Sequence, residues 1–346
     1  MKKILAMLLA LVMILSLAAC ASTPAADTPA ESTSTTETPV TETPASAEET
    51  PAAEGETYTV GVCQLVQHEA LDAATQGFVD ALTEELGDAV TIDVQNASGD
   101  SVNCGTIVNG FVSRGVDLIM ANATPALTAA VSATADIPIL GTSITAYGVA
   151  LDLDDFNGTV GGNVSGTSDL ADLQKQAQMI LDWFPETKNV GLLFCSAEPN
   201  SRYQIDEVRK ALEAQGVTCE EFAFTDSNDV SSVTQKAADF SDVVYIPTDN
   251  TAASNTEAIA NVLIPAGVPA ICGEEGLCRG CGVATLSISY YDLGVTTGKM
   301  AAKILKGEAD ISEMPVEYTD ATPKYNASIC DQLGITPLDG YEAIDG

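Results

Sequence analysis

Apolar positions in the first half of the chain fall into short continuous runs, separated by longer segments in which apolar residues recur at helical spacing. Such runs are typical of strands that are buried on both faces, as parallel strands are. Strands that alternate with helices predict right-handed crossovers and a parallel sheet. The predicted strands are 58–65, 90–94, 116–120 and 137–140, and the predicted helices between them are 69–86, 101–113 and 125–132.

The same order of elements returns in the second half of the chain. Ile137-Pro138 and Val268-Pro269 open the fourth strand of each half, so the pattern repeats after roughly 130 residues. We therefore predict an α/β protein with two similar doubly wound parallel-sheet domains, a hinge and an interdomain cleft. The predicted strands of the second half are 190–194, 217–222, 243–246 and 268–272, and its predicted helices are 201–215, 230–238 and 251–263.

A glycine-rich segment at 155–166 separates the two halves and is interpreted as the crossing point. A phosphate-binding loop is the alternative, but the segment lacks the Gly-Lys-Ser/Thr ending of such loops. The predicted N-terminal lobe is 57–163 plus about 290–320. The predicted second lobe is 164–289 plus the C-terminal tail at about 321–346.

The N-terminus has the pattern of a lipoprotein signal peptide over residues 1–20. Lys2 and Lys3 precede an apolar run at 4–18, and small residues precede Cys20, which is the predicted lipidation site. An ordinary signal peptide with a chance cysteine is the alternative. Residues 21–56, almost only Ala, Ser, Thr, Pro, Glu and Asp, predict a disordered acidic tether that spans up to ~100 Å. We expect a protein anchored to the outer face of the cytoplasmic membrane, and a long tether favours a Gram-positive envelope.

Composition excludes several classes of function. A formal net charge of -35 would repel a phosphate backbone, so no nucleic-acid partner is expected. His68 is the single histidine, which excludes a metal site with two His ligands from one chain. The chain has no nucleophile elbow, zinc-protease motif or P-loop, so neither catalysis nor a cofactor is expected.

Polar residues follow the predicted strands, and ligands of open parallel sheets bind beyond the carboxyl ends of the strands. Hydroxyls and amides on one wall would bind a carboxylate, and Asp249 or Glu274 on the other wall would bind an ammonium group, which suits an amino acid zwitterion. The alternative is that these residues only cap helices, and for His68 that it faces solvent at the start of a helix. The candidates are Gln64, His68, Asn122, Thr124, Thr142, Ser143, Glu198, Asn200, Ser201, Asp249, Asn250 and Glu274, with Tyr147, Tyr203, Tyr290 and Tyr291 as aromatic candidates.

Eight cysteines remain besides Cys20. Cys272, Cys278 and Cys281 lie close together in the sequence, and three interpretations stay open for them: buried thiols, a local disulfide, or a metal site.

The ordered motifs of the folded body resemble those of the tryptophan/tyrosine-type substrate-binding proteins of ABC transporters, over roughly 57–319. Two stretches depart from that family: Gln67-His68-Glu69 stands where Glu-His-Pro is usual, and Ile144-Thr145-Ala146-Tyr147 where Val-Thr-Asp-Pro is usual. The motifs are Gln64–Asp72, Ala123–Ala126, Gly162–Asp169, Glu198–Ser201, Pro247–Asn250, Gly273–Gly276 and Tyr290–Gly294.

The resemblance implies a type I periplasmic-binding fold that takes a small molecule such as an aromatic amino acid. It also implies an ABC permease and ATPase as partners, and we expect a monomer. A nucleobase or another small nitrogen compound as ligand, or a sensor module for a membrane kinase, are the alternatives. The cleft residues carried over from the family are Gln64, His68, Thr124, Ser165, Glu198, Asn200, Ser201, Asp249, Asn250 and Glu274.

Overall fold

The structure is a computed structural model that describes residues 56–344. The predicted signal peptide with Cys20, and the tether up to residue 55, lie outside the described residues. The described residues belong to one compact unit that contains two β-sheets. We call the part of the chain around each sheet a lobe.

The first lobe is built on a six-stranded sheet in which every pair of neighbouring strands is parallel. Its strand order, β11-β5-β4-β3-β1-β2, requires a crossover helix between consecutive strands. The strands are β1 (Tyr58–Gln64), β2 (Val90–Asn96), β3 (Leu118–Asn122), β4 (Ile139–Ile144), β5 (Val164–Ser168) and β11 (Glu317–Tyr318).

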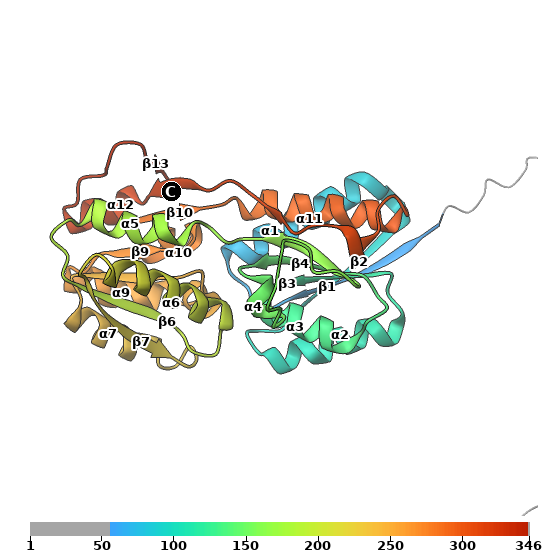
Figure 1. Cartoon of the computed structure of the whole chain (residues 1–346), viewed down its shortest axis with the longest axis horizontal. Coiled ribbons are helices and arrows are strands. Elements are labelled where there is room, and N and C mark those ends of the chain that lie inside the picture. The colour runs from blue at the N-terminus through green and yellow to red at the C-terminus, as the bar shows by residue number, and fades with distance from the viewer. Residues whose placement is uncertain (1–55, 345–346) are drawn as a thin grey trace, which may run out of the picture. The chain divides into compact units, whose positions relative to one another are not determined.

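Helices cover both faces of the first sheet (Figure 1). On one face Phe78 and Met300 pack against Val60, and on the other Phe111 and Leu127 belong to a separate apolar cluster. The first face is covered by α1 (Glu69–Leu86) and α11 (Tyr290–Leu305), the second by α2 (Ser101–Arg114) and α3 (Thr124–Ala133), and the short elements of this lobe are α4 (Tyr147–Ala150), η1 (Gly87–Ala89) and η2 (Ile311–Glu313).

The second lobe is built on a seven-stranded sheet of order β13-β12-β10-β9-β8-β6-β7. It is parallel except where β12 runs antiparallel to β10. The strands are β6 (Asn189–Cys195), β7 (Thr218–Phe224), β8 (Val243–Ile246), β9 (Ala270–Cys272), β10 (Ala284–Ser287), β12 (Thr322–Tyr325) and β13 (Glu342–Ala343).

This second sheet is also covered on both faces, by two separate apolar clusters. Ile180 and Ile205 belong to one cluster, and Ile259 and Leu277 belong to the other. The helices are α5 (Leu173–Trp183), α6 (Pro199–Glu213) and α12 (Ala327–Leu333) on the first face, and α7 (Val230–Phe240), α8 (Asn250–Ala253), α9 (Thr256–Ala266) and α10 (Glu275–Cys281) on the second.

The predicted fold class is confirmed: the chain is α/β with two parallel-sheet domains of similar order. The predicted boundary after residue 163 is wrong. Val164 pairs with Ile139, so 164–168 forms β5 within the first sheet, and the chain crosses only after Ser168. The glycine-rich segment at 155–166 is likewise held in the first lobe, where the Gly158 carbonyl accepts a hydrogen bond from Val316 N.

Three segments connect the lobes: the chain after β5, the chain between β10 and α11, and the chain between β11 and β12. The tail after β11 therefore returns to the second lobe, while 290–318 lies in the first.

Helices α1 and α11 pack at backbone contact distance. A Cβ atom at Gly77 would lie 2.1 Å from Tyr291 O, and one at Gly294 would lie 2.0 Å from Ala74 O. Only glycine permits such an approach, because any side chain would displace the facing backbone. The two helices therefore form one stiff pair that lines one face of the first sheet.

Candidate ligand-binding site

The carboxyl ends of the strands in the two lobes face each other, and two polar contacts join them. Nε2 of His68 lies 3.2 Å from Oδ1 of Asn250. Nε of Arg279 donates to Oε1 of Glu69 at 3.0 Å. His68 and Glu69 begin α1 in the first lobe, and their partners belong to α8 and α10 in the second. The predicted cleft edge at His68 is therefore an interlobe contact.

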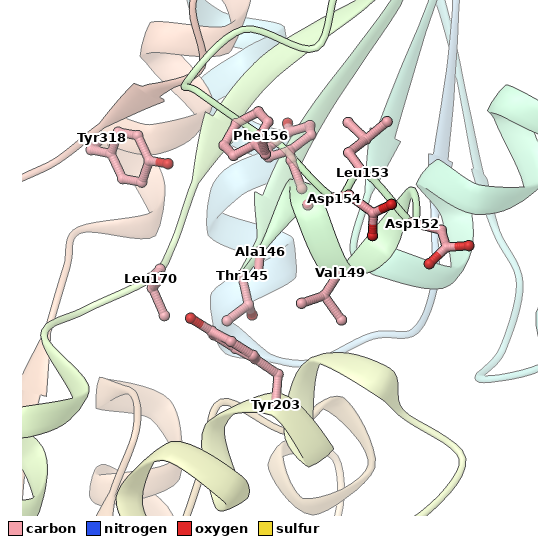
Figure 2. A pocket seen from close by; sticks show the side chains of 12 residues that line it. Thr145, Ala146, Val149, Asp152, Leu153, Asp154, Phe156, Leu170, Tyr203 and Tyr318 are labelled. Carbon is pink, nitrogen blue, oxygen red and sulfur yellow. The ribbon is translucent and has the colours of Figure 1, made fainter.

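A cavity of about 490 Å³ is lined by residues of both lobes. Tyr203 extends from α6 of the second lobe toward Leu170 and Thr145, and Tyr318 and Phe156 lie on the opposite side (Figure 2). Three of these five side chains are aromatic. The remaining lining residues are Ala146, Tyr147, Gly148, Val149, Asp152, Leu153 and Asp154.

Ser143 is the predicted first-lobe residue with the most distinctive geometry. It lies at the end of β4, where the pairing with β5 shifts register, and its φ of 56° falls in the left-handed region. Its Oγ is buried and has no hydrogen-bond partner among the described residues. Ala123, at the end of the neighbouring strand β3, has a φ of 87°. Strained backbone at two adjacent strand ends, together with an unpaired hydroxyl, is typical of a binding site.

Gln64 and Asn122 support the start of α1. The Thr75 hydroxyl donates to Gln64 Oε1 at 2.6 Å, and Asn122 Nδ2 donates to Thr75 Oγ1 at 2.9 Å and to Leu71 O at 2.8 Å. These bonds attach α1 to the ends of β1 and β3. Both residues lie at the predicted strand ends, but most of their hydrogen-bonding capacity is used within the lobe.

Thr142 and Ser165 lie deeper than the cleft. Thr142 shares a buried chain of hydroxyls with Thr167 and Thr297. Ser165 Oγ donates to Met314 O at 3.0 Å, which fixes the segment after η2 against β5. Thr124 is buried at the first residue of α3. Thr142 and Ser165 therefore hold the first lobe together, and a ligand role for them stays a prediction.

The buried carboxylates of the second lobe are occupied by backbone N–H groups. Glu198 accepts from the backbone N–H groups of Asn250 and Thr251 at 3.0 and 2.9 Å. Asp249 accepts from Ala252 N at 2.8 Å and from Cys195 N at 2.6 Å. Both residues thereby satisfy the free donors at the start of α8.

Glu274 has the same role at α10, where its two carboxylate oxygens accept from Gly276 N and Leu277 N. Burial raises the pKa of Glu274 to about 7, because desolvation outweighs these two hydrogen bonds. Burial and the neighbouring Glu198 likewise raise the pKa of Asp249. Of the two interpretations of Asp249 and Glu274, helix capping is what the structure shows, and ammonium binding stays a prediction.

Asn200 and Ser201 begin α6 next to these carboxylates. Asn200 Nδ2 donates to Thr248 O at 3.1 Å and lies 3.3 Å from Glu198 Oε2. Its Oδ1 is buried and has no hydrogen-bond partner among residues 56–344. Ser201 is fully buried. Asn200 is therefore the predicted second-lobe residue that keeps an unused acceptor.

His68 is half-buried, and burial lowers its pKa, while its contact with Asn250 and the nearby Glu198 act in the opposite direction. The neutral imidazole is therefore favoured, with the tautomer that carries its proton on Nε2 donating to Asn250 Oδ1. The alternative in which His68 faces solvent is wrong.

The aromatic candidates divide into two groups. Tyr147 and Tyr203 line the cavity, although Tyr147 is otherwise buried in the first lobe with its hydroxyl 3.2 Å from Thr167 O. Tyr290 is buried at the crossing before α11. Tyr291 lies outside the cleft: it is 42% exposed and donates to Asp80. The sequence interpretation missed Tyr318, which follows no predicted strand.

Asp169 was also missed. It follows β5 directly, its carboxyl is 6% exposed, and Oδ2 accepts from the Tyr290 hydroxyl at 2.9 Å. Its Oδ1 has no hydrogen-bond partner within the described part of the chain. The position could have been found had 164–168 been recognised as a strand, because Asp169 is then a strand-end carboxylate.

All eight cysteines in the described residues are free thiols, and seven are buried. No group of three or more His, Cys, Asp or Glu side chains in 56–344 is arranged to hold a metal ion. No helix in the same range is long and apolar enough to cross a membrane. Of the three interpretations of Cys272, Cys278 and Cys281, the structure shows thiols.

Two parallel-sheet lobes joined by three crossings, with a cavity between their strand ends, define a solute-binding protein of the type I periplasmic-binding fold. The family model of the ABC transporter substrate binding protein matches residues 59–340. The chain belongs to this family.

Relatives agree with the assignment. The tyrosine-binding protein of Clostridioides difficile (strain R20291) is 33% identical over 284 residues, which cover 80% of this chain and 81% of that protein. An ABC domain from Streptococcus pneumonia, solved in complex with L-Trp, is 33% identical with a TM-score of 0.79 and covers 84% of this chain and 100% of that one.

A ligand-free, open substrate-binding protein with adhesive properties from Clostridium difficile is 34% identical. It covers 84% of this chain and 99% of that one, with a TM-score of 0.64. At nearly equal identity, the TM-score is higher for the L-Trp complex than for the ligand-free, open protein.

Family membership fixes the coarse role of the chain. It is an extracytoplasmic substrate-binding protein that takes a small molecule and works with ABC transporter subunits. Its relatives are binding proteins.

Proposed function

We propose that the chain captures an aromatic amino acid between its two lobes and delivers it to an ABC importer. The observation that carries this proposal is the aromatic cavity built from both lobes, with Tyr203 on one wall and Tyr318 and Phe156 on the other. A cavity of about 490 Å³ is within the range of small-molecule sites, which are roughly 300–1,000 Å³. The L-Trp complex and the tyrosine-binding relative support the same ligand class.

Buried unpaired atoms support a zwitterionic ligand. Ser143 supplies an unused hydroxyl from the first lobe, which would donate to the ligand carboxylate. Asn200 supplies an unused carbonyl from the second, which would accept from the ligand ammonium group. Buried polar groups without partners are rare in folded proteins, so a ligand that satisfied both would offset the cost of burying them unpaired.

Closure of the lobes would follow from this division of contacts. A ligand that bonds to Ser143 and Asn200 together binds the closed arrangement more tightly than an open one. Only that difference in affinity shifts the equilibrium toward closure. The closed pair of lobes is then the form that the permease would recognise.

The direct test is isothermal titration calorimetry of residues 21–346 with L-Trp, L-Tyr and L-Phe, and with adenine and uracil as non-amino-acid controls. We expect saturable binding of at least one aromatic amino acid and none of the nucleobases. A thermal shift should accompany binding, because ligand at 100 times its dissociation constant adds about 2.7 kcal/mol of stability. Binding of a nucleobase alone would overturn the ligand assignment.

We also propose that the chain is a monomer attached through Cys20 to the outer face of a Gram-positive cytoplasmic membrane. The small residues before Cys20 and the acidic tether after it support this. Expression of Cys20→Ser in a Gram-positive host should release the protein into the medium, whereas the parent chain should sediment with membranes and carry a diacylglyceryl mass. Equal release of both would contradict the anchor, and light scattering of the released form tests the monomer.

A further inference from the structure

Asp169 occupies the carboxyl edge of the first sheet, at the first crossing between the lobes. Its N–H donates to Ile144 O at 3.2 Å, and the preceding Ser168 hydroxyl donates to Thr145 O at 3.0 Å. Thr145 and Leu170, the contacts on either side of Asp169, both line the aromatic cavity. Asp169 therefore lies at the end of β4 and β5, where open parallel sheets bind ligands.

The carboxyl group of Asp169 is buried without a countercharge. Its exposure is 6%, Oδ2 accepts from Tyr290, and Oδ1 has no hydrogen-bond partner among the described residues. Burial raises its pKa, and the groups that oppose this are the hydroxyls of Tyr290 and Thr145 and its own backbone N–H. None of these carries a positive charge. A buried carboxylate in such surroundings is costly until a cation reaches it.

The other buried carboxylates of the cleft differ in this respect. Glu198, Asp249 and Glu274 accept backbone hydrogen bonds on both of their oxygens. Asp169 is the buried cleft carboxylate with an oxygen left unused, and it is the nearest along the chain to the cavity wall.

We infer that Asp169 is a specificity-determining residue: its Oδ1 accepts a charge-assisted hydrogen bond from the ammonium group of the ligand. This deepens the proposed function and rests on it. It restricts the ligand to primary amines such as amino acids, because an analogue without the amine would leave the carboxylate buried and unpaired. Asn200 of the second lobe also has a buried oxygen without a partner, which would serve as a neutral acceptor for a second N–H of the same group.

Tyr290 acts as the positioning residue for this site. Its hydroxyl comes from the first residue of α11 and fixes Oδ2, so Oδ1 is the oxygen that is left without a partner. The titratable groups that face Asp169 are the phenols of Tyr290 and Tyr147, with Glu274 beyond Tyr290. Burial raises the pKa of both phenols, so each stays protonated at neutral pH.

The test compares an aromatic amino acid with its des-amino analogue, for example L-Trp with 3-(indol-3-yl)propionate and L-Tyr with 3-(4-hydroxyphenyl)propionate, by titration calorimetry. In Asp169→Asn the affinity for the amino acid should fall by about 100-fold or more, while that for the analogue stays within about 3-fold or rises. Asp136→Asn is the matched control, because Asp136 is exposed and lies away from the cavity; it should change neither affinity.

The outcomes separate the two proposals. If the wild-type chain binds no aromatic amino acid, the proposed function is overturned together with this inference. If it binds the amino acid, but Asp169→Asn binds it equally well, the inference alone is overturned. Equal affinity of the wild-type chain for the amino acid and its analogue also overturns the inference.

Two further readouts do not depend on Asp169→Asn folding. Binding of the amino acid to the wild-type chain should release protons increasingly as the pH is lowered from neutral, because burial raises the pKa of the free carboxyl and the ammonium group favours its ionised form. The des-amino analogue should release none. In Tyr290→Phe the pH at which amino acid affinity declines should shift upward, because the carboxylate loses a hydrogen bond that lowers its pKa. Absence of proton release with the amino acid would overturn the inference.

Discussion

The two lobes share the order of their first five strands but treat their buried carboxylates differently. In the second lobe the carboxylates of Asp249 and Glu274 are satisfied by the N-termini of helices. In the first lobe, Ser143 Oγ and Asp169 Oδ1 are buried and unpaired. A satisfied carboxylate contributes to stability, whereas an unpaired group is available to a ligand. The second lobe also keeps an unpaired buried atom, Asn200 Oδ1, so the contrast concerns the carboxylates: Asp249 and Glu274 cap helices, whereas Asp169 keeps one oxygen without a partner.

The largest expected effect comes from removing a satisfied carboxylate. Asp249→Ala leaves Cys195 N and Ala252 N without their acceptor, and both groups are buried. We expect a loss of about 3 kcal/mol in the free energy of unfolding, measured by urea denaturation. Asp136→Ala, at an exposed position, should cost less than about 0.5 kcal/mol. A similarly small loss in Asp249→Ala would contradict the conclusion that the helix-capping carboxylates of the second lobe stabilise the fold.

The pH dependence of stability tests the helix-capping carboxylates of the second lobe. The folded-state pKa of Glu274, raised to about 7, exceeds its usual value of 4.5, so the folded chain binds more protons than the unfolded chain between these values. Its contribution is therefore complete below about pH 4 and is lost as the pH rises through about 7. One such group changes the free energy of unfolding by at most ~1.4 kcal/mol per pH unit.

Urea unfolding at several pH values should accordingly give a stability that falls between about pH 5 and about pH 8. Glu274→Gln should flatten this slope, whereas Glu257→Gln, on the exposed side of α9, should not. Half-buried Glu221, whose pKa is lowered by Arg202, acts in the opposite direction and at lower pH. An unchanged slope in Glu274→Gln would contradict the assignment of a buried acid.

Tyr203 sharpens the comparison, because it is the second lobe's aromatic contribution to the cavity. Tyr203→Ala should weaken binding of an aromatic amino acid by about tenfold, as expected for loss of one aromatic contact. Titration calorimetry measures this. Tyr291→Ala provides the matched control, because Tyr291 lies on α11 outside the cavity. Equal effects of the two substitutions would show that Tyr203 does not contact the aromatic ring of the ligand.

Ser143 gives the smallest expected effect. Ser143→Ala should weaken amino acid binding by about fivefold and leave the free energy of unfolding within about 0.5 kcal/mol, because its hydroxyl is unpaired in the folded chain. Ser165→Ala should show the reverse, with a loss of about 1 kcal/mol in stability and unchanged affinity, since its hydroxyl bonds to Met314 O. If both variants changed only stability, Ser143 would belong to the scaffold.

Most of the fold could be predicted because strands buried on both faces give continuous apolar runs, such as 190–194. Strand β5 could not, because Ser165, Thr167 and Ser168 are polar yet buried. Their hydroxyls form hydrogen bonds to groups within the first lobe, such as Thr142 Oγ1 and Met314 O. The helix predicted at 251–263 is two helices, because the chain turns at Ser254–Asn255 between α8 and α9. In both cases local hydrogen bonding overrode the pattern of hydrophobicity.

The sequence predicted where the two lobes meet better than it predicted the contacts made there. Strand ends correctly indicated where the lobes meet, as the His68–Asn250 contact shows. The sequence could not tell a capping carboxylate from a free one, because Asp249 and Asp169 both follow a strand. The difference depends on whether a helix begins immediately afterward: α8 begins after Asp249, whereas three residues separate Asp169 from α5.

The tight contact between α1 and α11 has a mechanical consequence. Helix α1 begins beside His68 and Glu69, which reach across to the second lobe, and α11 begins at Tyr290, which holds Asp169. Because the glycine contacts hold the two helix backbones directly against each other, we expect the two helices to move as one rigid body. A displacement of His68 and Glu69 at the interlobe contact would then also displace Tyr290 and the Asp169 carboxyl that it holds.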